Sequence, residues 1–187
     1  MLTDREIIST LEMLENENLD VRTVTLGINL FDCASHDPET VRNKNFSRIS
    51  HLANNLVPVC DRIGEKYGIP VVNKRIAVSP IAVVGAALSS SQMVDVAKTL
   101  NAVAEEVNVD FIGGFSALVQ KGIARGDRAL IEAIPHALTA TERVCASINV
   151  ASTRAGINMD AVLLMGNTIK QAAKLTADKD GLACAKL

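Results

Sequence analysis

The feature that most constrains this fold is a repeated alternation of short β-branched runs with longer segments whose apolar residues recur every three or four positions. A parallel pair of strands needs a crossover connection of a dozen or more residues, which is usually a helix. This alternation therefore predicts an α/β fold whose sheet is mostly parallel. The runs expected to form strands are 21–29, 71–78, 109–112 and 144–150.

The helical segments carry recognisable start signals. Thr3 and Glu6 have the spacing of a capping box, and Asp37 followed by proline is typical of a helix start. Pro58 is expected to kink or split the long helical pattern after Asp37. Asp127 and Asn158 are expected to cap two later helices.

The end of the sequence also contributes to the expected sheet. Residues 182–187 have the pattern of a strand that is just beginning. With four strand–helix units before it, this run predicts a sheet of about five strands, in a single α/β domain over residues 1–187. Two arrangements remain open at this point, namely an open doubly wound sheet and one half of a barrel. In either case, right-handed crossovers place the helices on the sheet faces.

Composition restricts the class of function. Charged residues make up 21% of the chain and the net charge is −2, which gives no electrostatic case for nucleic-acid binding. No apolar run approaches the roughly 18 residues that span a membrane, and the first residues lack a signal-peptide core. We therefore expect a cytoplasmic protein that binds neither nucleic acid nor membranes.

The four cysteines include no CxxC pair and are expected to be reduced thiols. Cys60 and Cys145 lie in apolar patterns and are expected to be buried as small hydrophobic residues. Cys33 and His36 are close enough in sequence to share a metal ion, but two ligands without a second pair predict no metal site.

The first candidate site is the run Gly113-Gly114-Phe115-Ser116. The strand before it is expected to break at Gly113 and continue into a helix. Backbone N–H groups of Gly113 and Gly114, with the Ser116 hydroxyl, would then face a small anionic ligand. A tight connection that needs glycine for close packing explains the same residues. Neither a Walker loop nor a GxGxxG fingerprint is present.

The second candidate site follows the strand expected at 144–150. Arg154 would hold a carboxylate or phosphate bidentately, assisted by the hydroxyls of Ser152 and Thr153 and by the helix start at Asn158. The alternative is that Ser152, Thr153 and Asn158 only cap the helix and that Arg154 lies on the surface.

A third polar run, Asn73-Lys74-Arg75, interrupts a strand that is otherwise apolar. Burying these side chains is costly unless they are paired, so one of them is expected to point into a polar interior. An edge strand or a subunit interface would explain the run equally well.

Three stretches carry a resemblance to a known family, namely 73–81, 109–122 and 148–160. They resemble an uncharacterised prokaryotic family, a domain of unknown function whose members are about twice as long. The resemblance covers essentially the whole chain, which looks like the N-terminal half of a member. It implies a fold similar to the barrel of pyruvate formate-lyase-like glycyl radical enzymes, whose ten strands form two five-stranded halves. It also implies a homodimer.

The resemblance assigns no catalytic residue and no cofactor. Glycyl radical chemistry needs a glycine on a C-terminal loop and a cysteine at the barrel centre, and neither can be placed in this sequence. A shared fold is not a shared reaction. Two hypotheses remain open. The first is an enzyme that acts on a small anionic metabolite in a pocket at the strand ends. The second is a non-catalytic ligand-binding or regulatory protein that forms homo-oligomers.

Overall fold

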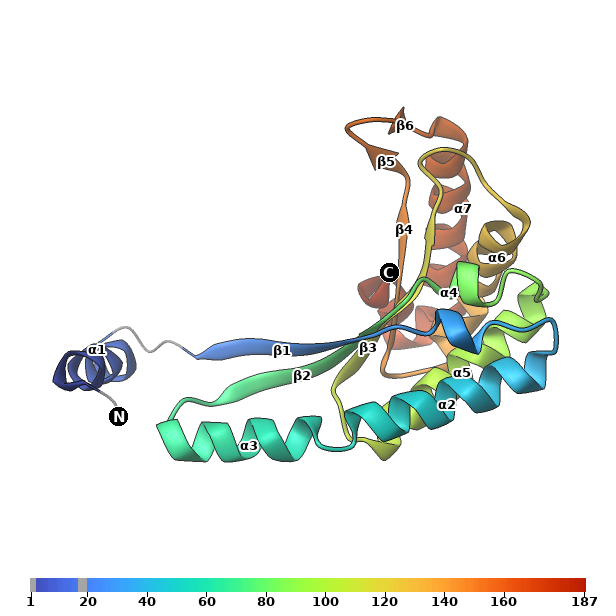
Figure 1. Cartoon of the computed structure of the whole chain (residues 1–187). Helices are drawn as coiled ribbons and strands as arrows, with labels where there is room; N and C mark the ends of the chain where they lie inside the picture. The colour runs from blue at the N-terminus through green and yellow to red at the C-terminus, as the bar shows by residue number, and fades with distance from the viewer. Residues whose placement is uncertain (1–2, 17–19) are drawn as a thin grey trace.

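The computed structural model describes residues 3–16 and 20–187 (Figure 1). Within them, four parallel strands form one sheet in the order β1-β2-β3-β4. The strands of this sheet are β1 (Val21–Ile28), β2 (Val71–Val78), β3 (Phe111–Leu118) and β4 (Val144–Asn149), and a small antiparallel hairpin consists of β5 (Ala151–Ser152) and β6 (Gly156–Ile157). The α/β prediction with a parallel sheet is confirmed.

Helices connect the strands in chain order. The α-helices are α1 (Asp4–Glu15), α2 (Pro38–Ala53), α3 (Leu56–Tyr67), α4 (Ile81–Val84), α5 (Ser90–Glu106), α6 (Arg125–Ala140) and α7 (Met159–Leu175). Three short 3₁₀ turns complete the described chain, namely η1 (Phe31–Cys33), η2 (Ala177–Lys179) and η3 (Leu182–Lys186). None of the helices described is long and apolar enough to cross a membrane.

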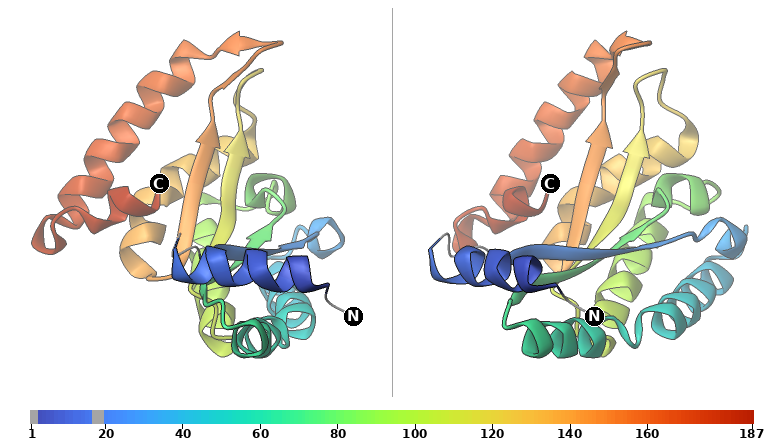
Figure 2. Two further views of the ribbon diagram at one scale, coloured as in Figure 1. Left: turned by 90° about the vertical axis from the view of Figure 1, so that its left-hand side faces the viewer. Right: turned by 60° about the vertical axis from the view of Figure 1, so that its left-hand side comes forward.

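The sheet is strongly twisted, so that β1 and β2 run crosswise to β4 in Figure 1. Helices α2, α3, α5, α6 and α7 all lie on one side of it (Figure 1). In the left view of Figure 2, β3 and β4 face the viewer and α6 lies behind them. A curved parallel sheet with helices on its convex side is compatible with half of a barrel.

The hydrophobic core fills the space between the sheet and these helices. Alternate residues on the helix side of the strands point into it, and the buried ones include Ile28, Ile76, Ile112 and Val144, whereas the first halves of β1 and β2 are less covered. Among the described residues, Phe115 is the one aromatic side chain of the buried core. Helices α2, α3, α5, α6 and α7 leave the opposite face of the described strands uncovered (Figure 1).

The expected break of the third strand at Gly113 is wrong. Strand β3 continues to Leu118, and its register with β4 shifts between Gly113 and Phe115, which is a β-bulge. Gly114 has φ of 113°, and a Cβ there would lie 2.5 Å from the carbonyl oxygen of Val78. Glycine is therefore required here for a bulge and for close approach of β3 to β2, not for a turn into a helix.

The expected fifth strand at the end of the sequence is also wrong. Residues Leu182–Lys186 form the 3₁₀ turn η3, which contacts α7 and β4. Gly181, with a φ of 72°, begins this turn, and the Thr176 hydroxyl accepts a hydrogen bond from the backbone N–H of Ala183 at 3.3 Å. The main sheet described here consequently has four strands, not five.

Most of the helix signals are confirmed. The capping box of Thr3 and Glu6 is present, and Asn158 caps α7. The helix pattern before Pro58 is split as expected, with Pro58 in the first turn of α3, where its missing N–H costs no hydrogen bond. Asp127 does not occupy the cap position of α6. It lies one turn inside and accepts a hydrogen bond from the N–H of Ala124, the actual cap residue, at 2.9 Å.

Candidate functional site

The candidate site lies on the sheet face opposite the helices, which we call the open face. Along each strand, its residues alternate with those that point into the core. In β3 the bulge at Gly114 adds one residue, after which Phe115 points into the core and Ser116 lies on the open face. The open face carries mainly small and polar side chains, in contrast to the aliphatic core on the other side. Its members are Val21, Thr23, Thr25 and Gly27 of β1, Val71, Asn73, Arg75 and Ala77 of β2, Phe111, Gly113, Ser116 and Leu118 of β3, and Cys145, Ser147 and Asn149 of β4.

One row across the open face has almost no side chains. The register aligns Gly27, Ala77, Gly113 and Cys145 on four successive strands. A Cβ built at Gly27 would meet no atom within 4 Å, and one at Gly113 would meet only the Ile76 carbonyl oxygen at 4.0 Å. We call these four residues the floor row. Backbone is exposed there, so a small molecule can lie close against the sheet.

Arg75 lies beside the floor row. It is exposed, and its guanidinium carbon is 5.3 Å from the centre of the Phe111 ring, which is a cation–π distance. Its neighbour Lys74 belongs to the opposite face, where its Nζ pairs with Asp61 Oδ1 of α3 at 3.1 Å. Strand β2 lies between β1 and β3, but its ladder with β3 begins at Arg75, so an edge explains Asn73 and not Arg75. No carboxylate pairs with Arg75 among the described residues.

Cys145 ends the floor row on β4. It is only half-buried, so its expected burial as a core residue is wrong. Burial nevertheless raises the pKa of the Cys145 thiol, and the positive charges of Lys186 and Arg75 partly oppose that rise. The thiol is therefore protonated near neutral pH, which does not favour attack as a thiolate.

Lys186 of η3 is the second cation near this thiol. Its Nζ donates hydrogen bonds to the carbonyl oxygens of Leu138, at 2.7 Å, and Thr141, both at the C-terminal end of α6. Burial lowers the pKa of the Lys186 ammonium. These bonds hold the ammonium at the helix end, where the helix dipole favours positive charge.

The structure separates the residues of the first candidate site. Gly113 belongs to the floor row of the open face. Gly114 is the bulge residue packed against Val78, and Ser116 donates from its Oγ to the Gly114 carbonyl oxygen at 3.3 Å. The three residues consequently do not form a phosphate-binding turn at a helix start.

The second candidate site forms the β5–β6 hairpin beyond β4. Ser152 Oγ accepts from the Ala155 N–H at 3.0 Å, while Thr153 and Arg154 are exposed at the hairpin tip. Asn158 Oδ1 accepts from the N–H of Ala161 at 3.2 Å, and its Nδ2 donates to the Val119 carbonyl oxygen at 2.7 Å. Asn158 therefore joins the hairpin to the end of β3, and Arg154 lies exposed at the hairpin tip.

The site residue that the sequence analysis missed is Cys145. The alternation of side chains along β4 could have placed it on the open face. Cys145 shares its face with the polar residues Ser147 and Asn149, whereas the intervening residues Val144, Ala146 and Ile148 are apolar. Cys33 and Cys60 are buried in the described structure. Residues 3–16 and 20–187 hold no group of three or more His, Cys, Asp or Glu side chains arranged for a metal ion.

Comparison with known proteins places the chain in a family. The model of a family described as "Uncharacterised ACR (DUF711)" matches residues 12–187. The UPF0210 proteins of Syntrophobacter fumaroxidans, Desulfovibrio desulfuricans and Acetivibrio thermocellus are 66%, 63% and 54% identical to it over 187 residues. Each alignment covers all of this chain but 41% of the relative, so the chain spans about two fifths of the length of these proteins. The expected resemblance is thereby confirmed, and the chain belongs to the uncharacterised DUF711 (UPF0210) family.

Proposed function

We propose that the open face is one wall of a binding site for a small anionic metabolite, with Arg75 as the group that holds the anion. The observation that carries this proposal is the unpaired, exposed guanidinium of Arg75 beside a floor row that is nearly free of side chains. Guanidinium binds carboxylate and phosphate groups bidentately, and backbone exposed by glycine allows a ligand to approach closely. Arg75 takes the role that the sequence analysis gave to Arg154.

The first candidate function is an enzyme in which this wall binds the substrate and residues outside the open face transfer protons. The open-face residues named above include no carboxylate and no histidine, and the Cys145 thiol is held protonated. A non-catalytic ligand-binding or regulatory protein is the second candidate. It is favoured by this same lack of an acid or base, because binding alone needs only donors and positive charge.

The proposal also requires an opposite wall. We propose that it comes from the part of the longer family members that this chain does not span, which would complete a barrel like that of the glycyl radical enzymes, or from a second copy in a homodimer. The intact mass of the protein in its source cells distinguishes these. A mass near 19.9 kDa favours two copies, and a mass more than twice as large favours one longer chain.

The test measures anion binding to the intact protein, by thermal shift and calorimetry, with acetate and succinate as probes at constant ionic strength. Arg75→Ala removes the proposed anion partner, and Arg75→Lys keeps the charge without the bidentate geometry. Arg62→Ala, an exposed site on α3, is the matched control. A charge-assisted hydrogen bond contributes about 1.5–3 kcal/mol, so Arg75→Ala should weaken binding roughly 10- to 100-fold.

The proposal would be contradicted by failure of binding, or by binding that does not depend on Arg75. In the first case, no probe binds the wild-type protein beyond the effect of chloride. In the second case, Arg75→Ala binds as tightly as Arg62→Ala, or binding is lost in Arg154→Ala instead. Turnover of the bound anion by the intact protein would favour the enzyme over the non-catalytic candidate.

A further inference from the structure

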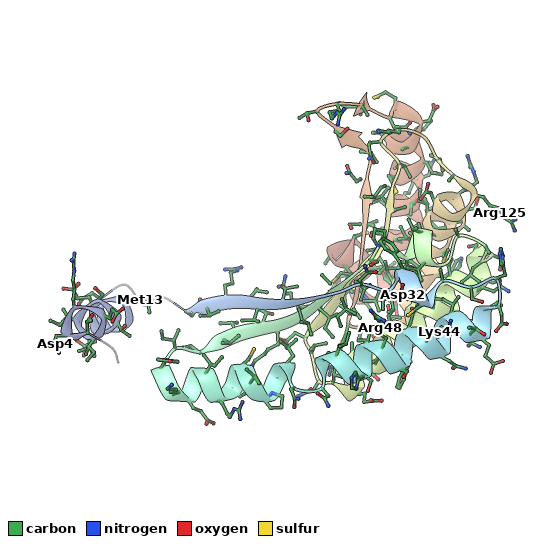
Figure 3. The ribbon with its side chains drawn as sticks, in the orientation of Figure 1. Asp4, Met13, Asp32, Lys44, Arg48 and Arg125 are labelled. Carbon is green, nitrogen blue, oxygen red and sulfur yellow. The ribbon has the colours of Figure 1, made fainter. Side chains whose placement is uncertain are left out.

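A second cluster of charged side chains lies away from the open face, between η1 and α2 (Figure 3). It surrounds a cavity of about 520 Å³, within the range of 300–1,000 Å³ that small-molecule sites commonly occupy. We call this cavity the η1–α2 pocket. It is lined by Asp32 and Cys33 of η1 and by Asn43, Lys44, Ser47, Arg48 and His51 of α2.

Both walls of the η1–α2 pocket are anchored. The turn η1 is preceded by the fully buried Leu30, whose N–H donates to Ser79 Oγ at 3.1 Å, and the Phe31 N–H donates to Asn29 Oδ1 at 2.8 Å. On α2, Val41 and Ile49 are fully buried on the neighbouring helix face. The lining residues therefore come from elements whose positions are set by the core.

The charge of the pocket is positive. Lys44 and Arg48 lie one helical turn apart on α2 and point toward η1 (Figure 3), and both lie near enough to the Cys33 thiol to lower its pKa against the larger effect of burial. Asp32 is the one carboxylate of the lining. Its Oδ2 is 3.6 Å from Arg48 Nη1, which is too long for a hydrogen bond, and its side chain is 81% exposed.

Arg48 retains unused donors. Its Nε is buried and has no hydrogen-bond partner among the described residues. The accessible part of the Arg48 guanidinium, whose side chain is 39% exposed, also makes no hydrogen bond within the described residues and is open to a ligand oxygen. Lys44 forms no ion pair within residues 3–16 and 20–187.

We propose that the η1–α2 pocket binds a phosphate group, either free phosphate or the phosphate of a small monoester. A phosphate carries a charge of about −1.5 to −2 and several strong acceptor oxygens, which matches two cations with nearby hydroxyl and amide donors. A single carboxylate carries one negative charge and would therefore neutralise only one of the two cations. This site is separate from the open face and does not depend on the proposed function.

The experiment titrates the intact protein with inorganic phosphate and with glycerol 2-phosphate, and with acetate at the same ionic strength. Saturable binding of a phosphate probe is expected, with Lys44→Ala and Arg48→Ala each weakening it at least about tenfold. Lys98→Ala, an exposed lysine on α5, is the matched control. Its phosphate affinity should equal that of the wild type.

Asp32→Asn provides a test that loss of folding cannot imitate. Removing this carboxylate frees Arg48 and removes repulsion of the ligand, so phosphate binding should become tighter. Stronger binding of the monoester than of free phosphate would identify an organic phosphate as the occupant. The proposal is overturned if no phosphate probe binds, if acetate binds equally well at a site that Arg48→Ala weakens, or if Asp32→Asn and Arg48→Ala leave the phosphate affinity unchanged.

Discussion

Replacement of Gly114 by alanine tests the bulge in β3 most sharply. At φ of 113°, a residue with a Cβ is strained by about 1–3 kcal/mol. The new Cβ would also lie 2.5 Å from both the Cγ2 and the carbonyl oxygen of Val78, so β2 and β3 must move apart. Such overpacking costs a further 1–3 kcal/mol, roughly. We expect Gly114→Ala to lower the free energy of unfolding by about 3 kcal/mol or more.

The neighbouring glycine is the matched control. A Cβ at Gly113 would come no closer than 4.0 Å to another atom, and φ there lies outside the left-handed region. Gly113→Ala should therefore change the free energy of unfolding by less than about 0.5 kcal/mol. Thermal unfolding of the two variants measures this difference, because each kcal/mol of lost unfolding free energy lowers the Tm of a chain this long by about 2–4 °C.

The expected result is a Tm that falls by roughly 6–12 °C in Gly114→Ala and by no more than about 2 °C in Gly113→Ala. Equal shifts in the two variants would refute the assignment of the bulge to Gly114. That outcome would favour the flexible glycine turn that the sequence suggests.

Two further predictions concern Asn158 and Cys145. Asn158→Ala removes the cap of α7 and the hydrogen bond to Val119, so the free energy of unfolding from chemical denaturation should fall by about 1–2 kcal/mol. Asn158→Asp keeps the cap acceptor and should lose less. Equal losses in the two variants would show that the cap contributes nothing. The rate of Cys145 alkylation, followed by site-resolved mass spectrometry, should rise with pH around a midpoint above the ordinary cysteine pKa of about 8.5, because the folded state favours the neutral thiol. Arg75→Ala should move this midpoint higher still, and a midpoint below that of free cysteine would contradict the burial of the thiol.

The order of elements was predictable because it depends on local patterns. The strand 71–78 coincides with β2, and the caps at Thr3 and Asn158 follow from hydrogen bonds between residues close in sequence. Such contacts are encoded within a few residues, so one sequence is enough to recognise them.

Gly114 and Cys145 show what the sequence alone does not reveal. Two consecutive glycines are typical of a turn, and only the approach of Val78, 36 positions earlier, makes Gly114 a bulge within a strand. Cys145 has an apolar neighbour on each side, so a hydrophobicity pattern places it in the core. Its position on the open face depends on which side of the sheet the helices cover, which is a property of the whole fold.

The location of the candidate site could be predicted only in part. Gly113 was recognised, but for a turn that does not exist, and Arg154 was favoured over Arg75 because it follows a strand end. Arg75 lies within β2, where only the pairing with β1 and β3 shows that its face is free of helices. The choice between these two arginines needs tertiary information.

The central claim is that the open face binds an anion, and protection of Cys145 in the intact protein tests it most directly. The alkylation rate of Cys145 is measured with and without the probe anion that binds most tightly. Cys184, whose Sγ is turned to the Ile169 carbonyl oxygen of α7, is the internal control. At an anion concentration ten times the Kd, alkylation of Cys145 should slow about tenfold while that of Cys184 is unchanged. An unchanged Cys145 rate with the anion bound would contradict the claim and place the anion elsewhere.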